Sequence, residues 1–80
     1  MKTKLKEILE RGNININEIY DFFENTEDVL IIKYDGIRNQ SKFNIILIAK
    51  ESRFETINIQ TDNLQLGLRL VLEKYQTFLD

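Results

Sequence analysis

The chain has 80 residues, which is the length of one small domain. Its residues are 42% hydrophobic and 30% charged, and 11 basic against 13 acidic side chains leave a net charge of −2, a composition that argues against disorder. The absence of His and Cys excludes Ser/His triads, thiolate nucleophiles, disulfides and Cys/His zinc sites.

The N-terminal segment predicts a short helix over Thr3–Arg11. Its apolar residues recur at the spacing of one helical face: Leu5, Ile8 and Leu9. Thr3 stands where it can cap the start, and Gly12 with Asn13 stands where a helix C-cap belongs.

The same segment does not predict export or membrane insertion. The first six residues carry charges that can begin a signal peptide, but charged residues interrupt the apolar run of about 7–15 residues that must follow. The longest apolar run, Ile45–Ala49, is far too short to span a bilayer. We therefore expect a soluble, cytoplasmic protein. The abundance of Ile, Asn and Lys over Ala fits an AT-rich genome, such as that of a low-GC bacterium or its phage.

A second helix start follows within residues 13–24. Asn15 and Glu18 stand at capping-box spacing, and Ile14 and Ile19 at the spacing of a hydrophobic staple. Four apolar residues then share one helical face, with Phe22 at its margin: Ile16, Ile19, Tyr20 and Phe23. The alternation of Asn and Ile over residues 13–17 also fits a strand, so both structures stay open here, with the helix favoured.

Three strand-like runs follow the turn residues Asn25–Asp28. β-branched and aromatic residues dominate all three: Val29–Tyr34, Phe43–Lys50 and Phe54–Gln60. The connections between them are short and polar, which favours antiparallel hairpins over parallel crossovers. The simplest arrangement is a meander with Phe43–Lys50 in the middle.

The C-terminal segment has the clearest helical pattern, and Asp62 and Gln65 stand at capping-box spacing at its start. Its apolar face comprises Leu64, Leu68, Val71, Leu72, Tyr75, Phe78 and Leu79, and the opposite side carries Gln65, Arg69, Glu73 and Gln76. The order α-(α)-β-β-β-α predicts an α+β two-layer domain. In it, a three-stranded antiparallel sheet is packed by a long C-terminal helix and one or two short N-terminal helices.

The first two predicted strands are apolar on both faces. In Phe43–Lys50, Ile46 and Ile48 point to the face opposite that of Phe43, Ile45, Leu47 and Ala49. In Val29–Tyr34, Val29 and Ile31 oppose Leu30, Ile32 and Tyr34. A sheet with one solvated face should alternate apolar and polar residues, as the third strand does. Either the N-terminal helices cover part of this second face, or it is an exposed patch that binds another subunit or a partner protein.

Leu66 and Leu70 form a second apolar feature, one turn apart and away from the main apolar face of the last helix. The N-terminal helix packing against the pair is one interpretation. A contact with a dimer mate or partner is the other.

Charges are segregated along the chain. Residues 13–32 contain five acids and no base, namely Glu18, Asp21, Glu24, Glu27 and Asp28, whereas residues 33–53 contain five bases and two acids. An acidic helix face can dock on a basic partner or imitate nucleic-acid phosphates. A solvated helix face is the commoner meaning of such a run.

The order α-β-β-β-α resembles double-stranded RNA-binding domains in topology alone. Those domains grip phosphates with a lysine cluster that opens the last helix. Here that helix opens with Asp62 and reaches its first base at Arg69, and the predicted hairpin loop offers only Arg38 and Lys42. RNA binding is therefore a less favoured alternative.

Enzymatic chemistry has little support, and we expect no cofactor or metal. The three glycines are isolated from one another, so no phosphate loop exists, and the serines lack a base. The leading hypothesis is a non-catalytic protein that occupies a surface of a larger protein, as inhibitors, immunity proteins and phage anti-defence factors do; a structural homodimer is the alternative. The candidate contact residues are Glu18, Asp21, Glu24, Glu27, Asp28, Ile46, Ile48, Leu66 and Leu70.

Overall fold

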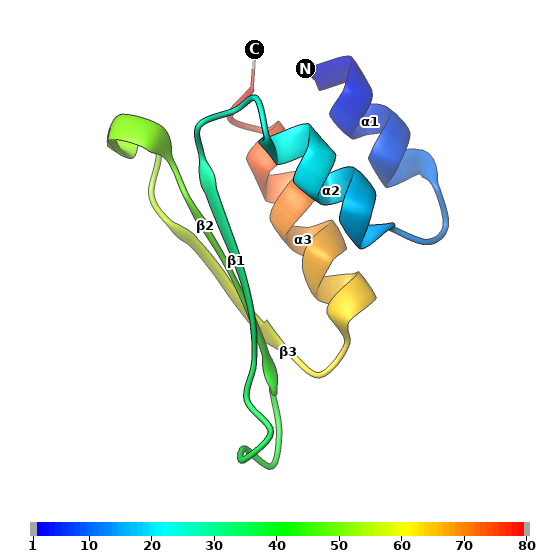
Figure 1. Cartoon of the computed structure of the whole chain (residues 1–80), viewed down its shortest axis with the longest axis vertical. Helices are drawn as coiled ribbons and strands as arrows, with labels where there is room; N and C mark the ends of the chain where they lie inside the picture. Colours follow the sequence, from blue (N-terminus) through cyan, green and yellow to red (C-terminus); the bar gives the residue numbers. More distant parts are fainter. Residues whose placement is uncertain (1, 80) are drawn as a thin grey trace.

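A computed structural model describes residues 2–79 and has the predicted order α-α-β-β-β-α (Figure 1). Its elements are α1 (Lys2–Glu10), α2 (Ile16–Phe23), β1 (Val29–Tyr34), β2 (Phe43–Ile48), the 3₁₀ turn η1 (Lys50–Ser52), β3 (Ile57–Thr61) and α3 (Leu64–Gln76). No helix in the described part of the chain is both long enough and apolar enough to cross a membrane.

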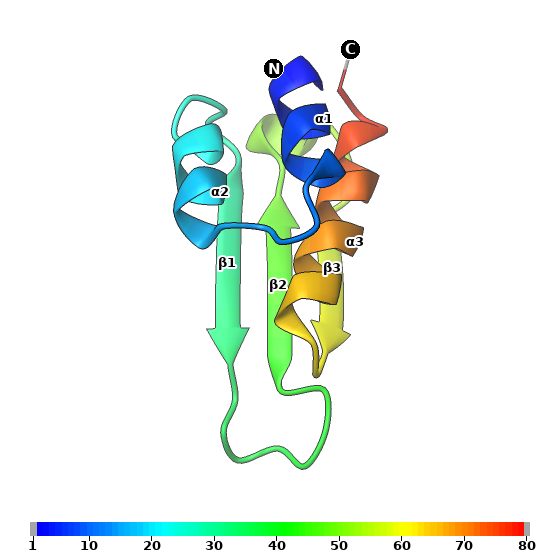
Figure 2. The same ribbon diagram turned by 90° about the vertical axis from the view of Figure 1, so that its right-hand side faces the viewer.

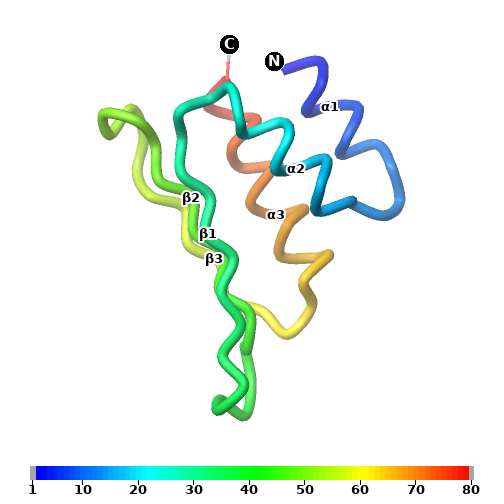
Figure 3. The backbone as a smooth tube through the Cα atoms, in the orientation of Figure 1, coloured from blue at the N-terminus to red at the C-terminus, as the bar shows by residue number. Residues whose placement is uncertain are grey.

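The strands form one antiparallel sheet in the order β1-β2-β3, which confirms the predicted meander. All three helices lie on the same face of this sheet (Figure 1, Figure 3). α2 lies over β1, and α3 lies on the β3 side of the sheet. α1 packs between α2 and α3, on the side of these helices away from the sheet (Figure 2). The interpretation in which N-terminal helices cover the second sheet face is therefore wrong.

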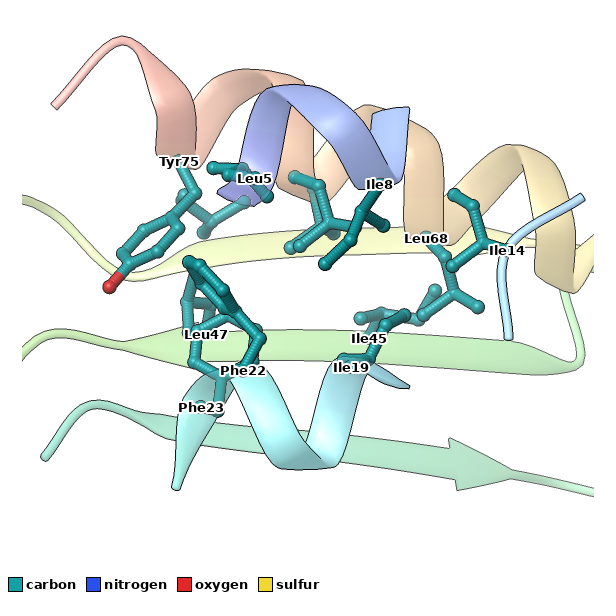
Figure 4. Packing of buried hydrophobic residues seen from close by; sticks show 13 residues of the cluster. Leu5, Ile8, Ile14, Ile19, Phe22, Phe23, Ile45, Leu47, Leu68 and Tyr75 are labelled. Carbon is teal, nitrogen blue, oxygen red and sulfur yellow. The ribbon is translucent and has the colours of Figure 1, made fainter. Parts of the chain in front are cut away.

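The hydrophobic core fills the space between the sheet and the helices (Figure 4). It consists of Leu5, Ile8, Ile14, Ile19, Phe22, Phe23, Ile45, Leu47, Ile57, Leu68, Val71, Leu72 and Tyr75. The rings of Phe22 and Phe23 meet edge to face, with centroids 5.2 Å apart. Tyr20, which the periodicity placed on the apolar face, is instead exposed. Phe22 and Phe23 point inward instead, and both rings lie against Tyr75 of α3, with centroids 6.3 and 5.2 Å away.

Residues 16–23 are helical, which decides between the two structures that the sequence left open. The side chain of Asn15 accepts hydrogen bonds from the amides of Asn17 and Glu18, as an N-cap does. Ile14 and Ile19 are both buried, as the staple predicts. Glu18 does not complete the capping box, because its carboxylate pairs with Arg11.

The start of α3 differs from the prediction by one residue. Asn63 is the N-cap, and its side chain accepts from the amide of Leu66 at 3.0 Å. Asp62 instead accepts from the Lys42 amide at 3.1 Å, which ties the β1–β2 hairpin loop to the start of α3. Hydrogen bonds from the amides of Ser41 and Lys42 lower the pKa of Asp62.

Gln65 also has a different partner from the predicted one. Its side chain accepts from the Ile14 amide at 2.7 Å and donates to the Ile14 carbonyl at 2.9 Å. Arg69 donates to the carbonyls of Leu9 and Arg11. Two polar residues that the helical pattern placed opposite the core therefore fasten the α1–α2 connection to α3.

Other boundaries shift for local reasons. β2 ends at Ile48 and β3 starts at Ile57, because η1 takes Glu51 and Ser52 into left-handed backbone with φ of 56° and 53°. α1 already begins at Lys2, and Gly12 does not adopt the left-handed conformation common at C-caps. Phe78 is half exposed rather than buried, and its ring stacks on Phe54 with centroids 4.5 Å apart.

Candidate functional site

The outer face of the sheet, opposite the helices, carries a contiguous apolar square. The β1–β2 register places Val29 beside Ile48 and Ile31 beside Ile46. Opposed residues in such a ladder have Cβ atoms about 5 Å apart, so the four side chains form one patch. Val29, Ile31 and Ile48 are 49%, 40% and 39% exposed, and Ile46, in the middle strand, is half-buried. We call these four residues the outer-face square.

Polar residues bound the outer-face square on the β3 side. The register places Asn58 beside Ile46 and Gln60 beside Asn44. The side-chain amide of Asn44 donates to the side-chain oxygen of Asn58 at 2.5 Å, and this hydrogen bond links β2 and β3 across the outer face. An apolar centre with a polar rim is the usual anatomy of a protein-contact surface.

Leu66 and Leu70 lie on a separate flank of α3. They are 49% and 42% exposed, so the N-terminal helix does not pack against them. The close approach of Gly67 to β2 and β3 shows which side of α3 faces the sheet, and Gln65 and Arg69 face the α1–α2 connection. By the helical period, the leucine pair lies on the flank of α3 that is turned away from the α1–α2 connection.

The acidic residues of the predicted contact set do not form one surface. Glu18 pairs with Arg11, and Glu27 pairs with Lys50. Asp21 and Glu24 remain exposed on or beside α2, with no ion pair within residues 2–79. The fifth acid, Asp28, is buried inside the domain.

Asp28 is the centre of a hydrogen-bonded cluster that joins three distant segments. Its side chain is fully buried. One carboxylate oxygen accepts from the Lys50 amide at 2.8 Å, and the other accepts from the buried Tyr75 hydroxyl at 2.5 Å. Arg53, whose side chain is half exposed, donates to both oxygens at 2.5 and 2.7 Å. Asp28 is therefore unavailable to a partner, which corrects its place in the predicted contact set.

The same cluster sets the protonation of its members. Burial favours the neutral carboxyl, but hydrogen bonds from Arg53, the Lys50 amide and Tyr75 outweigh burial and hold the pKa of Asp28 below its ordinary value. Burial and the hydrogen bond to Asp28 raise the pKa of Tyr75 to about 12. Asp28 is thus an ionised acceptor and Tyr75 a neutral donor at neutral pH.

The Asp28 cluster also holds two strained turns. Glu27, Glu51 and Ser52 have φ between 53° and 65°, a region that costs a residue with a side chain about 1 kcal/mol or more. All three adjoin residues of the cluster. A single buried carboxylate therefore fixes the entry to β1 and the turn after β2, and its role is structural.

A shallow depression of about 390 Å³ lies between α1 and α2, lined by Lys4, Asp21, Phe22 and Asn25. It brings the exposed acid Asp21, the base Lys4 and the core residue Phe22 together. Within residues 2–79, no three acidic side chains gather closely enough to hold a metal ion.

Of the predicted apolar contact residues, Ile48, Leu66 and Leu70 are exposed and Ile46 is half-buried, whereas the Asp28 cluster was not predicted from the sequence. Asp28 stands in a turn and looks like a solvated acid, because its partners lie 22, 25 and 47 residues away. The chain matches no family model, no curated protein and no solved structure in the comparisons made with each.

Proposed function

We propose that this protein is a non-catalytic binding protein that contacts a larger protein through the outer-face square. The observation that carries the proposal is the placement of all three helices on one side of the sheet, which leaves an apolar outer face uncovered (Figure 1). Contiguous exposed apolar patches with polar rims mark interaction sites in soluble proteins. Inhibitors and immunity proteins act in this way, by occupying a surface.

The chemistry of the face favours a protein as the partner. Small molecules bind in concave pockets, whereas a sheet face offers a broad surface to another broad surface. Nucleic acid needs clustered cations, but the strands carry one outward base, Lys33, on this face. Double-stranded RNA-binding domains grip phosphate with lysines at the start of their last helix. In this chain the carboxylate of Asp62 lies at the corresponding place, just before α3.

The acidic residues support the proposal less well. Asp21 lies on α2, on the opposite side of the sheet from the outer-face square, so one partner surface does not reach both. Glu18 and Glu27 are each neutralised by a base of this chain. We therefore assign the principal contact to the sheet and not to the acidic face.

Charge substitutions test this assignment. Ile31→Lys and Ile48→Lys each place a cation in the square, and Ile37→Lys makes the same change at a 94% exposed position in the hairpin loop. We expect wild type and Ile37→Lys to capture the same defined protein from source cells in stoichiometric amount. The two sheet variants should lose at least about tenfold in affinity, or about 1.4 kcal/mol.

The opposite pattern would contradict the assignment. Undiminished capture by Ile31→Lys and Ile48→Lys, with the fold intact by circular dichroism, would show that the outer-face square does not bind. Loss of capture on Asp21→Lys with Glu24→Lys would transfer the contact to α2.

A further inference from the structure

Within residues 2–79, no strand pairs with the outer edge of β3, and the hydrogen-bonding groups that it leaves free can be assigned. β3 pairs with β2 alone in the sheet order β1-β2-β3. The Asp35 amide donates to the Lys42 carbonyl at 2.8 Å, so Asp35 and Lys42 form a hydrogen-bonded pair. In an antiparallel ladder hydrogen-bonded and non-hydrogen-bonded pairs alternate, so every second pair along β1 and β2 is hydrogen-bonded. Carried through β2, this alternation turns the backbone amides and carbonyls of Asn58 and Gln60 toward the free edge.

α3 places apolar side chains directly above this edge. A Cβ atom on Gly67 would lie 2.7 Å from both Ile45 of β2 and Thr61 of β3, so the helix axis runs over the gap between these strands. Exposed Leu66 and Leu70 lie on the flank of α3 turned away from the α1–α2 connection, so we infer that this flank lies toward the free edge of β3. Half-buried Ile59 lies on the inner face of β3 beneath them.

We propose that two copies of this chain pair antiparallel through β3, about a two-fold axis at Ile59. In this register Asn58 of each copy stands opposite Gln60 of the other, and their free backbone groups bond to each other. Ile59 stands opposite its own counterpart. The two sheets become one six-stranded sheet, with the two α3 helices side by side on one face.

The helix spacing agrees with this register. Near Gly67 each α3 axis lies about half a strand spacing inward from β3, and the paired β3 strands would be about 4.8 Å apart. The α3 axes are then about 10 Å apart, within the usual range for packed helices. Gly67 lies level with the stretch between Ile59 and Thr61, so the leucine pair is centred close to the axis. Leu66 of each copy therefore meets Leu70 of the other.

The charges of this surface are also self-complementary. β3 has no charged residue from Ile57 to Thr61, so no like charges oppose each other in the new ladder. Because the α3 helices run antiparallel, Lys74 of one copy comes opposite Asp62 of the other. Lys74 has no ion-pair partner within residues 2–79, and Asp62 is exposed.

The other free edge is a poorer candidate. If two copies paired antiparallel through β1, Lys33 of one copy would lie opposite Ile31 or Val29 of the other, and β1 contains no acid that could pair with it. Lysine on an edge strand is a common protection against pairing. The dimer also keeps both outer-face squares exposed on one sheet face, so it would present the proposed contact surface twice; only this last consequence rests on the proposed function.

Light scattering of the full chain between about 1 and 300 μM tests the dimer. We expect wild type to shift from monomer to dimer, and Leu70→Lys to weaken dimerisation at least about 100-fold because each dimer contains the change twice. Ile48→Lys, in the outer-face square, should dimerise like wild type. A dimer lost in Ile48→Lys and kept in Leu70→Lys would overturn the proposal in favour of face-to-face packing. A monomer at all concentrations would overturn it as well.

Disulfide trapping tests the register, because the chain has no native Cys. Ile59→Cys should form an intermolecular disulfide on mild oxidation, since directly opposed non-hydrogen-bonded residues have Cα atoms about 4.5 Å apart. Gln60→Cys is more exposed, but its copies would be about 9 Å apart, beyond the reach of a disulfide. Faster cross-linking of Gln60→Cys than of Ile59→Cys would refute the register even if a dimer forms.

Discussion

Replacing Asp28 by alanine should destabilise the domain far more than any exposed acid would. The change removes the acceptor of the buried Tyr75 hydroxyl and of the Lys50 amide, and it leaves Arg53 to water. Each buried group left without a partner costs about 1–3 kcal/mol, and the exposed Arg53 head adds little. We expect a loss of about 2–4 kcal/mol in the free energy of unfolding, which lowers Tm by roughly 10–25 °C in a domain of this size.

A double-mutant cycle in urea isolates the cause. Tyr75→Phe should cost about 1–2 kcal/mol alone, because it removes one hydrogen bond to a charged acceptor and leaves Asp28 with its other donors. In the Tyr75→Phe background, Asp28→Ala no longer strands a buried hydroxyl, so the double variant should be more stable than the sum of the two losses by about 1 kcal/mol or more. Glu24→Ala serves as the control and should change stability by less than about 0.5 kcal/mol. Additive losses, or an Asp28→Ala effect no larger than the control, would refute the structural role assigned to this carboxylate.

Further predictions concern pH and packing. Because the folded pKa of Asp28 is lowered, its contribution is present above the ordinary pKa of about 3.9 and is lost as the pH falls through the folded value, so acid titration should destabilise wild type more than Asp28→Ala. Because the pKa of Tyr75 in the folded protein is raised to about 12, the free energy of unfolding of wild type should decline by up to about 3 kcal/mol from pH 10 to 12. Tyr75→Phe has no hydroxyl to ionise, so it should lack this decline in a denaturant titration. Gly67→Ala should lower stability by about 1–2 kcal/mol despite the better helix propensity of Ala, since the new Cβ meets Ile45 and Thr61, whereas Gly12→Ala, which meets nothing within 4 Å, should be neutral or slightly stabilising. Gln65→Leu should cost about 1–2 kcal/mol by freeing both backbone groups of Ile14, and retention of full stability would show that the contact is dispensable.

Local patterns in the sequence were sufficient for most of the fold. β-branched runs and short connections predicted the meander, and the Asn15 cap with its staple predicted the start of α2. These features depend on neighbours within a few residues. Boundaries failed where a distant residue competes, as when the hairpin loop takes Asp62 and leaves Asn63 to cap α3.

The candidate site was predictable only in part. Two-sided apolar strands pointed to the outer-face square, but the periodicity does not say on which side of the sheet the helices pack. Asp28 shows the opposite case, because a turn acid gives no local sign that Arg53 and Tyr75 close around it. Burial of a polar group is decided by long-range packing, which one sequence does not encode in any short pattern.

Thiol reactivity tests the central claim most directly. The claim is that the outer sheet face is exposed in the free protein and is the surface that the partner covers. Ile48 and Ala49 are adjacent, but Ile48 is 39% exposed and Ala49 is 5% exposed. In the isolated chain, the Ile48→Cys variant should react with a maleimide nearly as fast as an unfolded control, and the Ala49→Cys variant at least about 100-fold more slowly. Binding of the captured partner should protect Ile48→Cys. Slow labelling of Ile48→Cys in the free monomer, or unchanged labelling in the complex, would contradict the claim.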